Sequence, residues 1–185
     1  IKTIGVCGYE YTNAGSSAVQ ELGYAMASAI EYINQMLQRG LTIDDVAPKF
    51  FFTFGISTNY FMEVAKMRAA RIIWSNIIDA YKGNEESKKI FIHSKTSLYN
   101  QAKNDIYVNL LRTTTEAFSA IAGGADSIYT SPFDETIGLP DEFSRRLARN
   151  AQIILREESH LNAVIDPAGG SYYVETLTAE LAQKA

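Results

Sequence analysis

A fourfold repeat constrains this chain most: a short apolar run, a polar loop and a long amphipathic stretch recur in the same order. The apolar runs cover residues 3–7, 50–54, 89–92 and 127–130. In each amphipathic stretch, apolar side chains recur at the three- and four-residue spacing of one helix face. Strands that alternate with long helices favour a parallel sheet with right-handed crossovers. The repeat therefore predicts an α/β fold built from four β/α units.

Helix-ending and helix-starting residues support the same division. Gly40 and Gly83 follow the first two amphipathic stretches, and a pair of glycines at 123–124 follows the third. Glycine is favoured there because it tolerates the positive φ that often ends a helix. Asn59 precedes the second helical stretch, where a side chain that caps the helix is expected, and the fourth stretch runs from Asp141. The aromatic run 50–54 is typical of a buried strand.

The repeat length favours a barrel over a nucleotide-binding sheet. Each unit takes roughly 40 residues, which suits a TIM-type (β/α)₈ barrel, and four units make about half of one. The stretch 5–8 lacks the G-x-G-x-x-G order of a dinucleotide-binding turn, and no G-x-x-x-x-G-K-[ST] motif occurs. We expect residues 1–165 to form half of a barrel and residues 166–185 to start the linker or next segment. Because the chain opens on a strand-like segment without methionine, we interpret it as a piece of a longer protein.

Composition excludes several classes of function. The formal net charge of −4, without a dense run of Lys or Arg, gives no electrostatic support for binding nucleic acid or an anionic membrane. A single cysteine, Cys7, excludes an internal disulfide and fits a reducing cytosol, so we expect a cytoplasmic protein. With His93 and His160 as the only histidines, a zinc site of His and Cys ligands is not expected. No apolar run approaches the roughly 18 residues of a membrane span.

Polar side chains gather where the predicted strands end. In barrels of this type, ligands bind on the loops that follow the strands. The candidate residues in these loops are Tyr9, Glu10, His93, Lys95, Ser131, Asp134 and Glu135. If the strand pattern persists, Lys95 points to the same side as His93. These residues define the predicted mouth of the barrel.

Each of these candidates has more than one interpretation. Glu10 is suited to acid–base work but also to a solvated or paired position, and His93 is suited to a ligand role but also to a near-core position. Lys95 can hold a phosphate or carboxylate, or pair with Glu10 or Glu135. The acids at 134 and 135 can bind hydroxyls, or they can serve the start of the following helix.

One segment carries a family resemblance. Residues 59–71 read N-Y-F-M-E-V-A-K-M-R-A-A-R and are followed by Trp74. This helix, together with stretches 47–49, 111–114, 143–150 and 166–175, closely resembles the methylmalonyl-CoA mutase family in collinear order. The resemblance implies the last four strands of the family's substrate-binding barrel. It also implies an adenosylcobalamin-dependent conversion of methylmalonyl-CoA to succinyl-CoA in propionate metabolism, with the cobalamin domain beyond the barrel.

The departures from the family pattern concern the mouth. Where catalytic subunits have G-Y-H, with a histidine facing the corrin, this chain has Glu10. Where they have H-S-Q-T, with a glutamine touching the substrate, it has Lys95. Lys49 replaces an arginine that meets the CoA tail, and Ser131 replaces an asparagine. The acids at 134 and 135 match a pair associated with the adenosyl group.

The cobalamin-ligating pattern of the family, D-x-H-x-x-G, is also missing. Around His160 the chain offers Glu158 and Ala163 at its two defining positions. The resemblance therefore predicts no metal ligand and no cofactor on this chain, and adenosylcobalamin only in the holoenzyme.

These departures lead to one main prediction and two alternatives. We expect part of a small, non-catalytic subunit whose function is to pair with the catalytic large subunit and stabilise it, with no catalytic residue of its own. The first alternative is a competent acyl-CoA mutase in which Glu10 and Lys95 retune specificity. The second is an unrelated barrel lyase or aldolase that uses Lys95 as a Schiff base. Four units leave sheet edges and an apolar interior uncovered, so we expect the fragment to self-associate.

Overall fold

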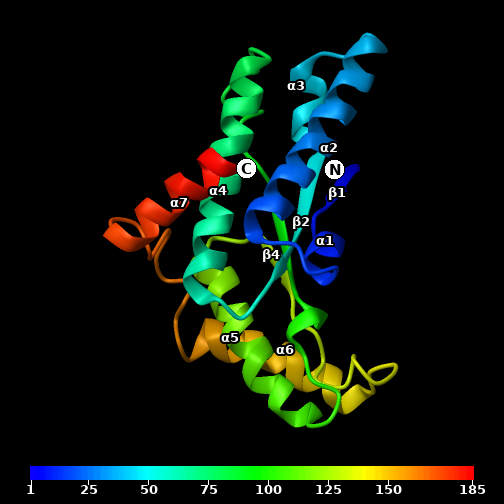
Figure 1. Ribbon diagram of the computed structural model, residues 1–185, viewed down its shortest axis with the longest axis vertical. Helices are drawn as coiled ribbons and strands as arrows, with labels where there is room; N and C mark the ends of the chain where they lie inside the picture. Colours follow the sequence, from blue (N-terminus) through cyan, green and yellow to red (C-terminus); the bar gives the residue numbers. More distant parts are fainter.

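A computed structural model describes all residues 1–185 as an elongated α/β structure (Figure 1). Three short 3-10 helices, η1 to η3, supplement the main elements. In chain order the elements are β1 (Ile4–Cys7), α1 (Tyr9–Asn13), α2 (Ala18–Gln38), α3 (Ile43–Val46), η1 (Ala47–Lys49), β2 (Phe50–Ile56), α4 (Tyr60–Ala80), β3 (Ile92–Thr96), η2 (Leu98–Asn100), η3 (Ile106–Val108), α5 (Asn109–Ala122), β4 (Ser127–Tyr129), α6 (Glu142–Glu157) and α7 (Tyr172–Lys184).

The four strands form one parallel sheet in the order β1-β2-β3-β4, so each strand pairs with the next one along the chain. This confirms the predicted parallel α/β fold. The register aligns Cys7, Thr53, His93 and Ser127 in a single row across the sheet. The carboxyl-terminal ends of all four strands therefore lie at the same end of the sheet, which we call the mouth.

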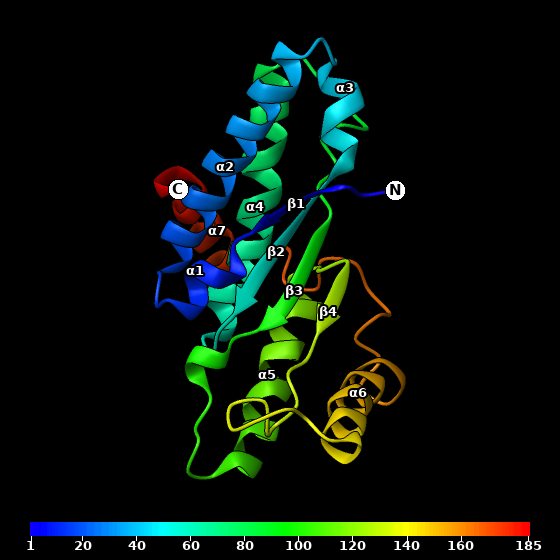
Figure 2. The same cartoon turned by 90° about the vertical axis from the view of Figure 1, so that its right-hand side faces the viewer.

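The core lies between the sheet and the helices α2 and α4, which run side by side (Figures 1 and 2). From β2 the side chains of Phe50, Phe52 and Phe54 enter this layer, and Trp74 of α4 packs on the first two at ring-centroid distances of 5.3 and 5.1 Å. Phe51 alternates to the opposite face. The aromatic run is thus core on one side only.

Most predicted helix boundaries are confirmed, with one correction. The Asn59 side chain accepts a hydrogen bond from the N–H of Met62 and starts α4, and Gly40 has the expected positive φ of 87°. After α4, however, the left-handed residue is Lys82, with φ of 59°, and not Gly83. Gly83 is required for space: a Cβ there would lie 2.5 Å from Cγ2 of Ile78.

The third strand begins later than predicted. The apolar run 89–92 only leads into β3, which extends from Ile92 to Thr96. The alternate residues that β3 buries are Ile92, Ser94 and Thr96, all 0% exposed. Because the last two are small and polar, the apolar run ends where the strand begins. The polar loop predicted after the first apolar run likewise contains the short helix α1.

Residues 166–185, predicted to start the linker or next segment, pack against the preceding domain (Figure 1). Helix α7 lies on α4 and α2 and buries Val174, Thr178 and Leu181. Arg68 of α4 ties the segment down through Asp166, 3.0 Å away, and Glu175, 2.8 Å away. That a further domain follows stays a prediction. None of the helices combines the length and apolar character needed to cross a membrane.

Candidate functional site

The face of the sheet opposite α2 and α4 carries its side chains in tiers set by the strand register. The lowest tier pairs Gly5 with Phe51, whose ring lies so close that a Cβ on Gly5 would be 2.7 Å from Cζ. The middle tier is the row that contains His93, and the top tier aligns Gly55 with Lys95 and Tyr129. Side chains stacked in layers are typical of the interior of a β/α barrel. This face is therefore the candidate site.

Lys95 is held at the centre of the mouth. Its Nζ lies 4.3 Å from the ring centroid of Tyr9 and 5.1 Å from that of Tyr129, distances at which a cation and an aromatic face attract. A carboxylate oxygen of Glu135 lies 3.9 Å from the same Nζ, and the Tyr129 hydroxyl donates to the other at 3.3 Å. Burial, and then the Glu135 carboxylate, raise the pKa of Tyr129. The mouth thus holds its own cation and counter-charge.

His93 occupies the tier below. Its Nδ1 lies 2.7 Å from Oγ of Ser127, which holds the ring against the sheet. Burial, and then the charge of Lys95, lower the pKa of the imidazole below its usual range, so the ring is neutral near pH 7. The structure brings together no group of three or more His, Cys, Asp or Glu side chains that could hold a metal ion.

The structure separates the remaining candidates into three positions. Glu10 is exposed on α1 and forms no ion pair, so of the two predicted partners of Lys95 only Glu135 is confirmed. Ser131 is buried, and its N–H donates to Oγ1 of Thr96 at 2.8 Å, which attaches the fourth loop to β3. Lys49 precedes β2 and lies at the opposite end of the strands from the mouth.

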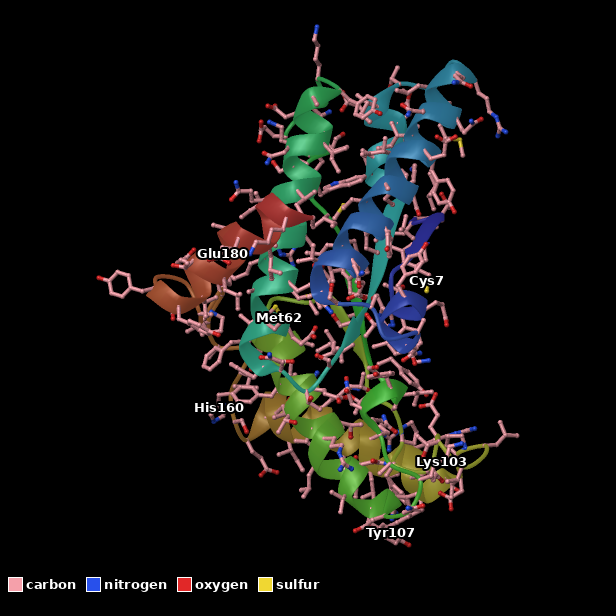
Figure 3. The ribbon with its side chains drawn as sticks, viewed as in Figure 1. Cys7, Met62, Lys103, Tyr107, His160 and Glu180 are labelled. Carbon is pink, nitrogen blue, oxygen red and sulfur yellow. The ribbon has the colours of Figure 1, made fainter.

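Asp134 serves the start of α6, as one of its predicted roles proposed. Its Oδ2 accepts a hydrogen bond from the N–H of Asp141 at 3.4 Å, and Asp141 caps α6 through the N–H of Ser144 at 2.7 Å. The other oxygen, Oδ1, is buried without a partner. His160 lies in the connection after α6, on the opposite side of the molecule from Cys7 of β1 (Figure 3). It is exposed and has a φ of 50°.

Sequence reasoning missed a buried ionic cluster behind the mouth. The Lys66 Nζ, 1% exposed, lies 2.6 Å from Glu21, 2.6 Å from Glu63 and 2.5 Å from the carbonyl oxygen of Gly55. Glu63 also accepts from the Ser57 hydroxyl at 2.5 Å. Burial alone would lower the pKa of Lys66, but the two carboxylates outweigh it and raise the pKa to about 12. The available signal was the presence of charged residues on helix faces that are otherwise apolar.

This cluster replaces a missing strand beside β2. The last bond between β1 and β2 runs from the N–H of Gly8 to the carbonyl of Thr53 at 2.8 Å, and the chain then turns into α1. Gly55, two residues further, would be left without partners on that side. Glu21 accepts from its N–H at 2.7 Å, and Lys66 donates to its carbonyl.

Gly55 is also where α1 approaches the sheet most closely. A Cβ on Gly55 would lie 2.6 Å from Cβ of Thr12 in α1. The close contact lets α1 fold over the end of β2 and places Tyr9, 4% exposed, beside Lys95. The ionic cluster and a glycine therefore position the mouth, although neither lies among the predicted site residues.

The proteins that this chain is similar to share one family description. A family model described as methylmalonyl-CoA mutase matches residues 1–185. The chain is similar to the methylmalonyl-CoA mutases of Cereibacter sphaeroides (47% identity over 99% of this chain and 26% of the relative) and Escherichia coli (44% over 99% and 26%). It is also similar to a methylmalonyl-CoA mutase small subunit of Porphyromonas gingivalis (44% over 100% and 30%). The chain thus spans between a quarter and a third of the length of these relatives.

Proposed function

This chain belongs to the methylmalonyl-CoA mutase family, and on that premise we propose that it is part of a non-catalytic small subunit that stabilises a catalytic partner. Overall identity does not separate the two kinds of subunit, since 47% to a relative named as the mutase and 44% to one named as the small subunit are nearly equal. The residues at the mouth therefore have to distinguish a catalytic subunit from a small subunit.

The Lys95 arrangement carries the proposal. The ammonium stands where the family pattern has a neutral glutamine, between Tyr9 and Tyr129 and beside Glu135. An acyl group that entered this space would have to displace a cation from two rings and a carboxylate. Separating a partly buried charge from its partners is costly, because water does not fully replace them. The mouth is therefore built for internal contacts in preference to a substrate.

We also propose that the sheet is the C-terminal half of a (β/α)₈ barrel. Strands paired in chain order support a barrel, because the strand order of a doubly wound sheet reverses at a switch point. The helices α2 and α4 on one face and stacked side-chain tiers on the other also suit a barrel wall. The free edges of β1 and β4 would then meet the other half.

The side chains on this chain do not fit a cobalamin. Adenosylcobalamin would need a cobalt ligand and a neutral surface against the corrin. His160 lacks the flanking Asp and Gly of the ligating pattern, and the corrin-facing position holds the exposed carboxylate of Glu10. We therefore assign the cofactor to the partner subunit of the holoenzyme. The single cysteine supports the cytoplasm as the compartment of this assembly.

The first test is a calorimetric titration of the complete subunit that contains this chain, in the absence of its partner subunit. The ligands are methylmalonyl-CoA and then adenosylcobalamin. Because Lys95 and Glu10 occupy the key positions, we expect no heat of binding for either. The Escherichia coli relative in the same assay is the positive control. Saturable binding of the acyl-CoA would contradict the scaffold proposal and favour the competent mutase in which Glu10 and Lys95 set specificity.

The variant Lys95→Gln tests the cause of exclusion. If the ammonium is what excludes the ligand, this variant gains acyl-CoA binding that the parent lacks. Lys103→Gln is the matched control, because it removes the same charge from an exposed loop residue far from the sheet (Figure 3). Equal behaviour of the two variants would show that Lys95 is not what excludes the acyl-CoA.

We further propose that residues 1–185 alone self-associate. Strands β1 and β4 each have one edge without a strand partner, and α1 covers the tiered face only near Gly55 and Lys95. Unpaired edges and uncovered apolar surface such as Phe51 favour association. Sedimentation velocity should therefore show concentration-dependent oligomers. A single monomeric species with cooperative unfolding would contradict this proposal.

A further inference from the structure

Glu116 is a buried acid that the mouth does not use. It lies on α5 with 1% of its surface exposed, and neither carboxyl oxygen has a hydrogen-bond partner. Its nearest charged neighbour across the helix interface is Glu63 of α4, which belongs to the cluster with Lys66 and Glu21. The buried ammonium of Lys66 therefore pairs with Glu21 and Glu63, and no ion pair reaches Glu116.

The surroundings of Glu116 require a bound proton on its carboxyl group. Lys66 contacts Glu21 and Glu63 directly, so their charges are at least partly balanced, whereas Glu116 has no cation or donor in contact. An ionised carboxylate without partners is very unfavourable in a protein interior. Burial, and then the charge of Glu63, raise the pKa of Glu116 to about 8, although Arg112 on the same helix acts in the opposite direction. Glu116 is therefore protonated at neutral pH.

No other element presents a charge to this carboxyl. Helix α5 contacts α4, α6, η3 and all of β2, β3 and β4. The strands β2 and β4 contain no charged residue, and His93 and Lys95 of β3 lie on the tiered face. Asp105 precedes η3 at the surface, and the charged side chains of α6 are exposed as well. Glu63 and Arg112 are thus the groups that set the charge balance at Glu116.

Helix α5 in turn holds the loops of the mouth. The side chain of Asn109, at its first residue and 0% exposed, accepts from the N–H of Ala102 at 3.0 Å. It donates to the carbonyl oxygens of Ala102 at 2.9 Å and Phe133 at 3.0 Å. One amide therefore joins the loop after β3 to the loop after β4, which carries the Glu135 partner of Lys95. Movement of α5 would move both loops.

We propose that Glu116 is a proton-dependent latch that keeps α5, and with it both loops of the mouth, docked against α4. Release of its proton to solvent leaves a buried carboxylate beside Glu63 with no cation in contact, and this loosens the helix. Because the acid binds its proton more tightly in the docked state, its contribution is complete below about pH 4.5 and is lost as pH rises through about 8. Between these limits the docking constant falls about tenfold per pH unit.

The test is hydrogen–deuterium exchange of the full-length chain at pH 6, 7, 8 and 9, corrected for intrinsic chemical exchange. In the wild type, the corrected exchange rate of peptides covering α5 and residues 130–136 should rise with pH. Between pH 6 and pH 8 the rise should be at most about tenfold per pH unit. In Glu116→Gln, which has no proton to release, this dependence should vanish. Glu180→Gln, on the exposed side of α7, is the matched control and should keep the wild-type slope.

Several outcomes would overturn the latch. An unchanged pH slope in Glu116→Gln would exclude Glu116 as its source, and an equal slope in α2 and α3 would indicate global unfolding. Should the glutamine variant not fold, Glu116→Leu replaces it, since leucine is also neutral and of similar volume. Infrared spectroscopy of the wild type gives an independent check, because a protonated carboxyl band must be present at pH 7 and disappear above pH 8. Absence of this carboxyl band at pH 7 would contradict the proposal.

Discussion

Replacement of Lys66 by methionine is expected to lower the free energy of unfolding by about 3–5 kcal/mol, which is a large fraction of the stability of an ordinary domain. Methionine preserves the length of the side chain, so the loss comes from charge and not from a cavity. Without the ammonium, Glu21 and Glu63 remain buried at 0% and 2% exposure, facing each other with no counter-charge. The carbonyl oxygen of Gly55 loses its donor as well. Urea denaturation of the full-length chain measures the effect.

A second variant separates the ion cluster from simple packing. Adding Glu21→Gln and Glu63→Gln to Lys66→Met removes the stranded charges, and we expect the triple variant to recover a large part of the loss. Lys184→Met is the control, because its ion pair with Glu180 is exposed and contributes about 0.5 kcal/mol or less. If Lys66→Met proved as harmless as this control, the cluster would not hold the mouth in place.

Truncation of Trp74 to alanine is the second large effect, with an expected loss of about 3–5 kcal/mol. Its ring is fully buried against Phe50 and Phe52 and fills the space between α4 and β2. Its Nε1 donates to the carbonyl oxygen of Ser87 at 3.2 Å, which anchors the segment that leads into β3. The truncation therefore creates a cavity and removes a buried hydrogen bond together. Thermal or urea unfolding of this variant measures the combined loss of stability.

Two further variants separate the contribution of the hydrogen bond to Ser87 from that of packing in the core. Trp74→Phe keeps a ring in the core but removes the donor to Ser87, and it should cost about 1–2 kcal/mol. Ile72→Ala lies on the same helix at 44% exposure and should cost about 1 kcal/mol or less. A Trp74→Ala loss no larger than that of Ile72→Ala would show that the aromatic layer does not carry the core.

Local patterns predicted most of the backbone. The Asn59 cap, the glycine at 40 and the strand at residues 50–54 each depend on residues close in sequence, and each was confirmed, although Phe51 of that strand lies outside the core. The course of β3 was not predictable from apolar runs, because the residues that it buries after Ile92 are Ser94 and Thr96. Space, not φ, requires a glycine at 83, and that depends on the position of Ile78.

The candidate site shows the same division. The chemistry at the mouth was recognisable from the sequence alone, since Lys95, Glu135 and Tyr9 each follow a predicted apolar run, and the pairing of Lys95 with Glu135 was one of the predicted alternatives. The groups that position the mouth were not. Lys66 meets Glu21 across 45 residues of sequence and Gly55 across 11. No local spacing reports such contacts.

By itself, the sequence determined the alternation of strands and helices, the family, and the residues that depart from its pattern at the mouth. These follow from the periods of helix and strand and from the identity of single side chains, which are local properties. Only the tertiary structure decided that Glu10 stands apart from Lys95, that Lys49 lies at the far end, and that residues 166–185 pack on α4. It also decided that Glu116 is buried without a partner. Burial and long-range pairing are properties of the packed chain, because they depend on which distant segments exclude water from a side chain.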